Sequence, residues 1–86
     1  MNTNVPTHGI GAADPLLPQA AAWVEALRAQ GEEILLYPIS RLQREFRIGY
    51  SRSCALVEVL ALDKYWTIAV AEDGSRYARL RLGEAE

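Results

Sequence analysis

The spacing of apolar residues changes once along the chain, near Tyr65, and this change restricts the fold more than any other feature. Before it, apolar residues recur every three or four positions, as in amphipathic helices. After it, residues 66–70 alternate between large apolar and small or polar side chains, which predicts a strand. Asp73-Gly74 is a strong hairpin-turn signal, and residues 76–82 alternate again. Helices followed by a β-hairpin indicate an α+β fold.

The part of the chain before this change predicts three helices and one short strand. We expect helices over residues 14–30, 40–46 and 51–62, and a strand over residues 34–37. Asp14 before a proline is typical of a helix start, with a later start marked by Pro18 as the alternative. Ser40 opens a capping-box pattern. Ser51 is expected to cap the third helix, and Gly49 to supply a positive φ angle in the connector before it.

The order helix, strand, helix, helix, strand, strand is that of a winged helix-turn-helix, with the C-terminal β-hairpin as the wing. The chain is long enough for one domain, which we place at residues 14–83, with flexible tails at 1–13 and 84–86. The side chains expected to be buried together are those of Trp23, Leu42, Phe46, Leu56, Leu60 and Ile68.

Several functions are excluded by residues that the chain lacks. One cysteine, Cys54, and one histidine, His8, cannot form an intramolecular disulfide or a zinc site. Without a Cys–His pair or a Gly-rich phosphate loop, we expect no enzyme and no cofactor. No apolar run approaches the ~20 residues that a membrane helix needs. The first 27 residues contain no Lys or Arg, so a secretory signal is not expected and the predicted location is cytoplasmic.

The net charge is −2, but two segments of the chain are basic. Residues 41–52 hold four arginines and one acid, and residues 76–82 hold three arginines and no acid. Each segment therefore carries +3, and the rest of the chain carries −8. Such a division lets one face attract a polyanion while the remainder keeps the protein in solution. Arginines that are simply solvated explain the same pattern, and this alternative stays open.

In the nucleic-acid interpretation, the third helix is the recognition helix in the major groove of double-stranded DNA. Arg52, with the hydroxyls of Ser51 and Ser53, is expected to contact base edges there. Five further arginines are expected to contact the DNA backbone or an adjacent groove: Arg41, Arg44, Arg47, Arg76 and Arg79.

The segment Leu42-Gln43-Arg44-Glu45-Phe46-Arg47-Ile48-Gly49-Tyr50-Ser51-Arg52 resembles the γ domain of FtsK/SpoIIIE-type DNA translocases. The resemblance implies a small winged helix that recognises short oriented sequences on duplex DNA, with Arg52 at the start of the recognition helix. The family usually has Asn where this chain has Ser51, so its target sequence is not carried over. The chain has no nucleotide-binding motor motif, and we expect a stand-alone regulator or a factor associated with a mobile element or chromosome.

A second function stays open beside DNA binding. The overall acidity, Ala55 on the third helix and the aromatic pair Tyr65-Trp66 favour a protein-interaction module that keeps the fold and no longer binds DNA. Its partner would be another protein or a second copy of the chain. Both interpretations leave the target sequence and the oligomeric state undefined.

Overall fold

The computed structural model describes residues 14–80, and the expected tails lie outside the described residues. Within that range the chain forms three helices and a three-stranded antiparallel sheet, which confirms the α+β class. The elements are α2 (Leu17–Ala29), β1 (Ile34–Leu36), α3 (Pro38–Phe46), α4 (Tyr50–Leu62), β2 (Thr67–Val70) and β3 (Arg76–Arg79). No helix in this range is long and apolar enough to cross a membrane.

The helices begin at different residues from those the sequence predicts. Tyr37 adopts a left-handed conformation (φ 53°), so the chain turns out of β1 directly into α3 at Pro38. Proline suits the first position of a helix because its missing N–H has no partner there. The expected capping box is therefore wrong, since Ser40 lies inside the first turn and makes no capping hydrogen bond.

The connector between α3 and α4 turns at an arginine and not at the glycine. Arg47 has a φ of 55°, whereas Gly49 is extended with a φ of −77° and serves as the N-cap of α4. The expectation for Gly49 is wrong, as is that for Ser51, which lies within the helix without capping it. The expected helix start at Asp14 is also wrong, since α2 begins at Leu17 with Leu16 as its N-cap and Pro18 in its first turn. Asp14 lies just before the helix, where its Oδ1 accepts a hydrogen bond from the Leu16 amide at 2.9 Å.

Strand β3 lies in the centre of the sheet and pairs with both other strands. Ala78 is opposite Leu35 of β1 and opposite Ile68 of β2. Because side chains alternate along a strand, Ala78 faces the helices while its neighbours Tyr77 and Arg79 face outward. The expected short strand and C-terminal hairpin are confirmed.

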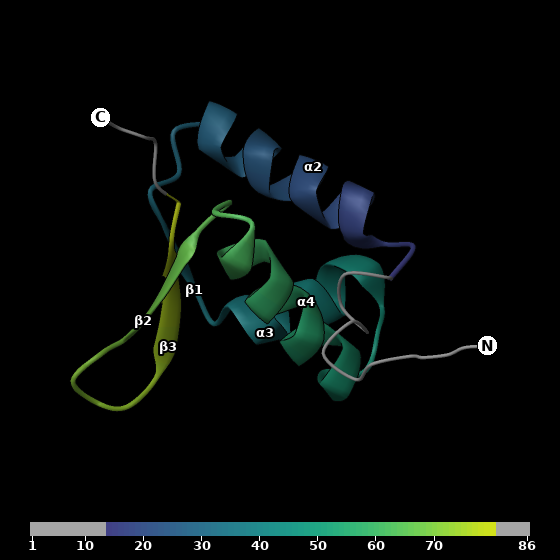
Figure 1. Cartoon of the computed structure of the whole chain (residues 1–86). Coiled ribbons are helices and arrows are strands. Elements are labelled where there is room, and N and C mark those ends of the chain that lie inside the picture. Colours follow the sequence, from purple (N-terminus) through teal and green to yellow (C-terminus); the bar gives the residue numbers. More distant parts are fainter. Residues whose placement is uncertain (1–13, 81–86) are drawn as a thin grey trace.

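The core lies between the three helices and the inner face of the sheet. Leu42, Leu56 and Leu60 are fully buried, as predicted. Trp23, Phe46 and Ile68 were also expected in the core but pack at its margin and are only partly buried. The residues that α2 buries are Ala20, Ala21 and Val24. Figure 1 shows α2 crossing the top of the view, with the hairpin loop at the lower left and the N-terminal end of α4 at the lower right.

Candidate nucleic-acid interface

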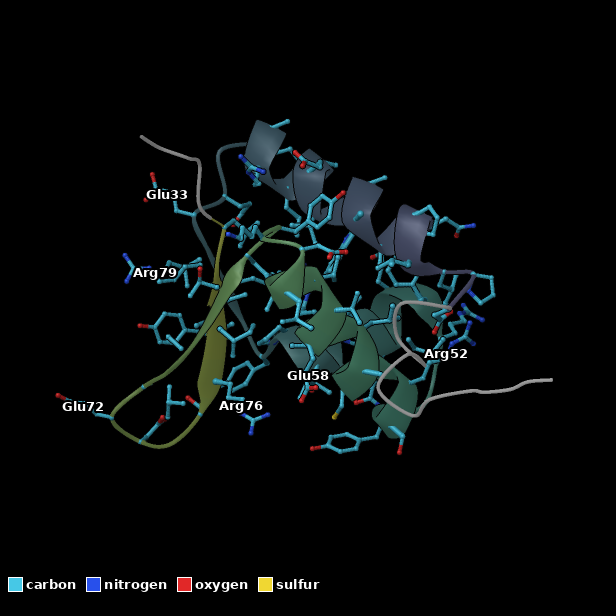
Figure 2. The ribbon with its side chains drawn as sticks, in the orientation of Figure 1. Glu33, Arg52, Glu58, Glu72, Arg76 and Arg79 are labelled. Carbon is cyan, nitrogen blue, oxygen red and sulfur yellow. The ribbon has the colours of Figure 1, made fainter. Side chains whose placement is uncertain are left out.

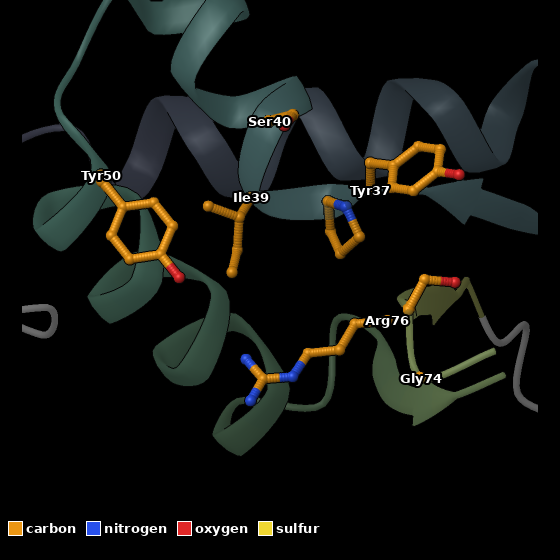
Figure 3. Close-up of a pocket in the computed structure, with 8 residues that line it drawn as sticks. Tyr37, Ile39, Ser40, Tyr50, Gly74 and Arg76 are labelled. Carbon is orange, nitrogen blue, oxygen red and sulfur yellow. The ribbon is translucent and has the colours of Figure 1, made fainter.

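Three segments distant in sequence meet around an open hollow of about 380 Å³. They are the start of α3 with the residue before it (residues 37–40), Tyr50 at the start of α4, and residues 74–76 of the hairpin. Figure 3 shows Tyr50 and Arg76 entering from different elements with their polar ends toward each other, and Ile39 beside the ring of Tyr50. The hollow exists because β1 leads directly into α3 while the hairpin reaches back to α4.

A second hollow, of about 420 Å³, is lined by Tyr37, Ser40, Gln43 and Arg44. It shares Tyr37 and Ser40 with the first, so the two hollows form one continuous surface. We call this the α3–hairpin surface, lined by residues 37–40, Gln43, Arg44, Tyr50 and residues 74–76. Within residues 14–80, no Asp or Glu lines either hollow, and arginine stands at each end.

The hairpin loop that carries Ser75 is fixed by its own hydrogen bonds. Asp73 Oδ1 accepts hydrogen bonds from the Ser75 amide at 2.9 Å and the Ser75 hydroxyl at 2.7 Å. These bonds hold the pKa of Asp73 below its usual value. Gly74 has a φ of 90°, which side chains rarely tolerate, and this allows the turn. The loop therefore presents Arg76 from a defined position.

The electrostatic surroundings of Tyr50 connect α4 with the hairpin. Its side chain is 63% exposed, which is unusual for a large aromatic residue on a small domain. Interaction with the neighbouring Cys54 thiol raises the pKa of Tyr50, while the nearby positive charge of Arg76 acts in the opposite direction. Tyr50 and Arg76 are thus close enough to act on one ligand.

The structure gathers only part of the predicted DNA-contact set on this surface. Arg44 and Arg76 line it. Arg47, just after α3, and Ser51, in the first turn of α4, are exposed without lining either hollow. Arg41 is partly buried, and its guanidinium carbon lies 6.0 Å from the centroid of the Trp23 ring. That distance suits a cation–π contact, so Arg41 is engaged with α2.

Arg52 is held in an ion pair and does not extend freely from α4. Its Nε and one terminal nitrogen each donate to Asp14 at 2.7 Å. The Asp14 side chain is only 4% exposed, and the guanidinium lowers the pKa of that carboxyl. Arg52 therefore joins the start of α2 to the start of α4.

Two further expectations change with the structure. Ser53 is fully buried and offers no surface to a ligand, so its inclusion among the DNA contacts is wrong for this conformation. Arg79 is exposed but lies on the outer face of the sheet, opposite Ile34 and Thr67. Figure 2 shows Arg79 and Arg76 well apart on the hairpin, and their odd spacing along β3 directs them to opposite faces.

Sequence reasoning missed the uncharged members of the surface, which are Tyr37, Ile39, Ser40, Gln43, Tyr50 and Ser75. No local pattern marks them, because they belong together only after β1, α3, α4 and the hairpin have folded. The described range 14–80 contains no group of three His, Cys, Asp or Glu side chains able to hold a metal ion. No family model, curated protein or solved structure matches the chain.

Proposed function

We propose that this chain is a small double-stranded DNA-binding protein of the winged-helix type. In this proposal α3 and α4 form the helix-turn-helix, and the β2–β3 hairpin is the wing. The observation that carries it is the α3–hairpin surface, which has arginine at both ends, hydroxyl and amide groups between them and no lining acid from the described residues. Such a surface suits the phosphates of a duplex, which attract cations and accept hydrogen bonds.

The proposed contacts differ from those expected of the sequence alone. Arg44 and Arg76 contact backbone phosphates, with Arg47 and Ser51 beside them, while Arg52 remains with Asp14. The exposed stripe of α4 beyond its first turn carries Glu58 and Leu62, so contact is concentrated at its N-terminal end. The resemblance of residues 42–52 to the translocase γ domain points to the same class of partner.

Fluorescence anisotropy with labelled duplexes at several salt concentrations tests this function. Arg44→Ala and Arg76→Ala should each weaken binding to all duplexes and reduce the salt slope by about 0.9 for each phosphate that the variant no longer neutralises. Arg79→Ala is the matched control, because Arg79 is an exposed arginine of the same strand on the other face. Absence of binding at low salt, or equal losses for Arg76→Ala and Arg79→Ala, would overturn the proposal.

A second candidate function rests on a different groove between α4 and the hairpin. Its lining is mainly apolar, from Val57, Ala61, Leu62 and Ile68, with Glu58 and Arg76 beside them. Leu62 is 77% exposed, and exposed apolar groups of this kind favour a protein partner. The anisotropy series distinguishes the two, since a module that binds only protein gives no duplex signal and no dependence on Arg44.

A further inference from the structure

The hollow between α3, Tyr50 and the hairpin has two chemically different walls. One wall is apolar and is made by Ile39 and the ring of Tyr50, while Pro38 borders the hollow but is fully buried. The other is polar and is dominated by the guanidinium of Arg76. A surface that only neutralises phosphates needs the second wall and not the first. The combination is suited to a ligand with a flat, weakly polar part joined to an anion.

We propose that this hollow binds one unpaired nucleotide, with its phosphate on Arg76 and its sugar and base against Ile39 and the ring of Tyr50. The ligand class is a nucleoside monophosphate or a nucleotide at the end or in a gap of a nucleic-acid strand. The proposal goes beyond duplex binding, because the bases of an intact duplex are stacked inside it and cannot enter the hollow.

The position of the phosphate is inferred from which charged and polar side chains of the hollow are not already engaged with other residues. Among the described residues, Arg76 is the only charged one that lines the hollow, and it makes no ion pair with another of them. The hydroxyl of Tyr50 points toward it in Figure 3, whereas Ser40 lies on the opposite side of the hollow. Ser75 is already bonded to Asp73, so we assign it no role in binding the ligand. A guanidinium with an adjacent hydroxyl is a suitable receptor for a phosphate.

The position of the sugar and base is inferred from the exposed aromatic side chains that border the hollow. Tyr50 is 63% exposed and Tyr37 is 58% exposed, so both aromatic side chains border the hollow and are not part of the core. Aromatic rings beside a cation are the usual platform for unpaired bases, because every base has a face that stacks. Ile39 is partly buried and provides the floor on which the sugar or base rests.

Titrations followed by amide NMR test the site with three probes: thymidine 5′-monophosphate, inorganic phosphate and thymidine. The monophosphate should bind most tightly, and its amide shifts should concentrate at residues 37, 39–40, 50 and 74–76, since Pro38 has no amide hydrogen. Arg76→Gln should weaken it about tenfold or more, the usual loss for a charge-assisted hydrogen bond. Tyr50→Ala should weaken the monophosphate more than inorganic phosphate, whereas Tyr50→Phe should retain the stacking contribution.

Arg79→Gln is the control and should leave all three titrations unchanged. Equal affinity for the monophosphate and inorganic phosphate would overturn the nucleotide assignment, as would equal behaviour of Arg76→Gln and Arg79→Gln. Should Arg76→Gln alter the fold, Arg76→Lys keeps the charge but removes the forked geometry, and it should still lose affinity for the monophosphate. Arg44→Ala separates this site from the proposed function, because it should impair duplex binding and leave monophosphate binding intact.

Discussion

Trp66 joins the start of the hairpin to α4, and we predict that Trp66→Phe substantially destabilises the protein. The Trp66 side chain is 2% exposed, and its Nε1 donates a hydrogen bond to the carbonyl of Val57 at 3.1 Å. Phenylalanine keeps an aromatic ring but removes this donor and part of the buried volume. Because the hairpin carries Arg76, the same substitution weakens the support of the candidate interface.

The expected loss follows from two contributions. A buried hydrogen bond contributes about 0.5–1.5 kcal/mol net, and the Val57 carbonyl retains its helical partner, so no large desolvation cost is added. Complete truncation of a buried aromatic residue costs about 3–5 kcal/mol, so the smaller change to phenylalanine should cost about 1–2 kcal/mol. The sum is about 1.5–3.5 kcal/mol, a large share of the roughly 3–10 kcal/mol expected for a domain of this size.

Urea unfolding followed by far-ultraviolet circular dichroism measures the effect. Trp23→Phe is the matched control, because the chain has two tryptophans and Trp23 is only partly buried. Its ring lies edge-on to Phe46 with centroids 5.9 Å apart, so the control should lose only about 1 kcal/mol. Equal losses at the two positions, or a loss below about 0.5 kcal/mol for Trp66→Phe, would refute the reasoning.

Two further predictions concern buried polar groups. Since Arg52 lowers the pKa of Asp14 below its ordinary value of 3.8, the pair stabilises the fold above that pH and loses its effect as the pH falls through the folded-state value. The advantage of wild type over Asp14→Asn in urea midpoint should therefore shrink in acid, and an advantage independent of pH would contradict this. Ser53 Oγ is buried with no hydrogen-bond partner among the described residues, so Ser53→Ala should be neutral or stabilising by about 1 kcal/mol in thermal unfolding. A marked loss would show that the hydroxyl is satisfied.

The periodic parts of the fold could be predicted from the sequence because helix and strand periods are local properties. The hairpin at Asp73-Gly74 and the strand at residues 34–36 both follow from such patterns. The helix starts could not be placed correctly, since the chain turns at Tyr37 and Arg47 in left-handed conformations that favour glycine. Neither residue type signals such a turn.

The only members of the candidate site that could be predicted from the sequence are arginines, because the basic segments mark them. Arg44 and Arg76 were expected to meet a partner, and both line the α3–hairpin surface. The role of Arg52 was not predictable, because its partner Asp14 lies 38 residues away in the sequence. Burial of Ser53 depends in the same way on how α4 packs against the rest of the domain.

For Arg52, the role predicted from the sequence and the contact seen in the structure lead to different experimental results. If Arg52 read bases, as the sequence predicts, Arg52→Ala would reduce discrimination among duplexes while the protein stayed folded. In the structure its side chain holds the buried Asp14, so removal should lower the thermal midpoint and leave Asp14 without its partner. At temperatures well below that midpoint, the variant should bind all duplexes with nearly wild-type affinity and an unchanged salt slope. Asp14→Asn is the companion variant, because it breaks the same pair while leaving the arginine in place. Equal thermal losses with unchanged binding in both variants support the structural role. Loss of discrimination in Arg52→Ala alone would show that Arg52 leaves Asp14 to contact DNA.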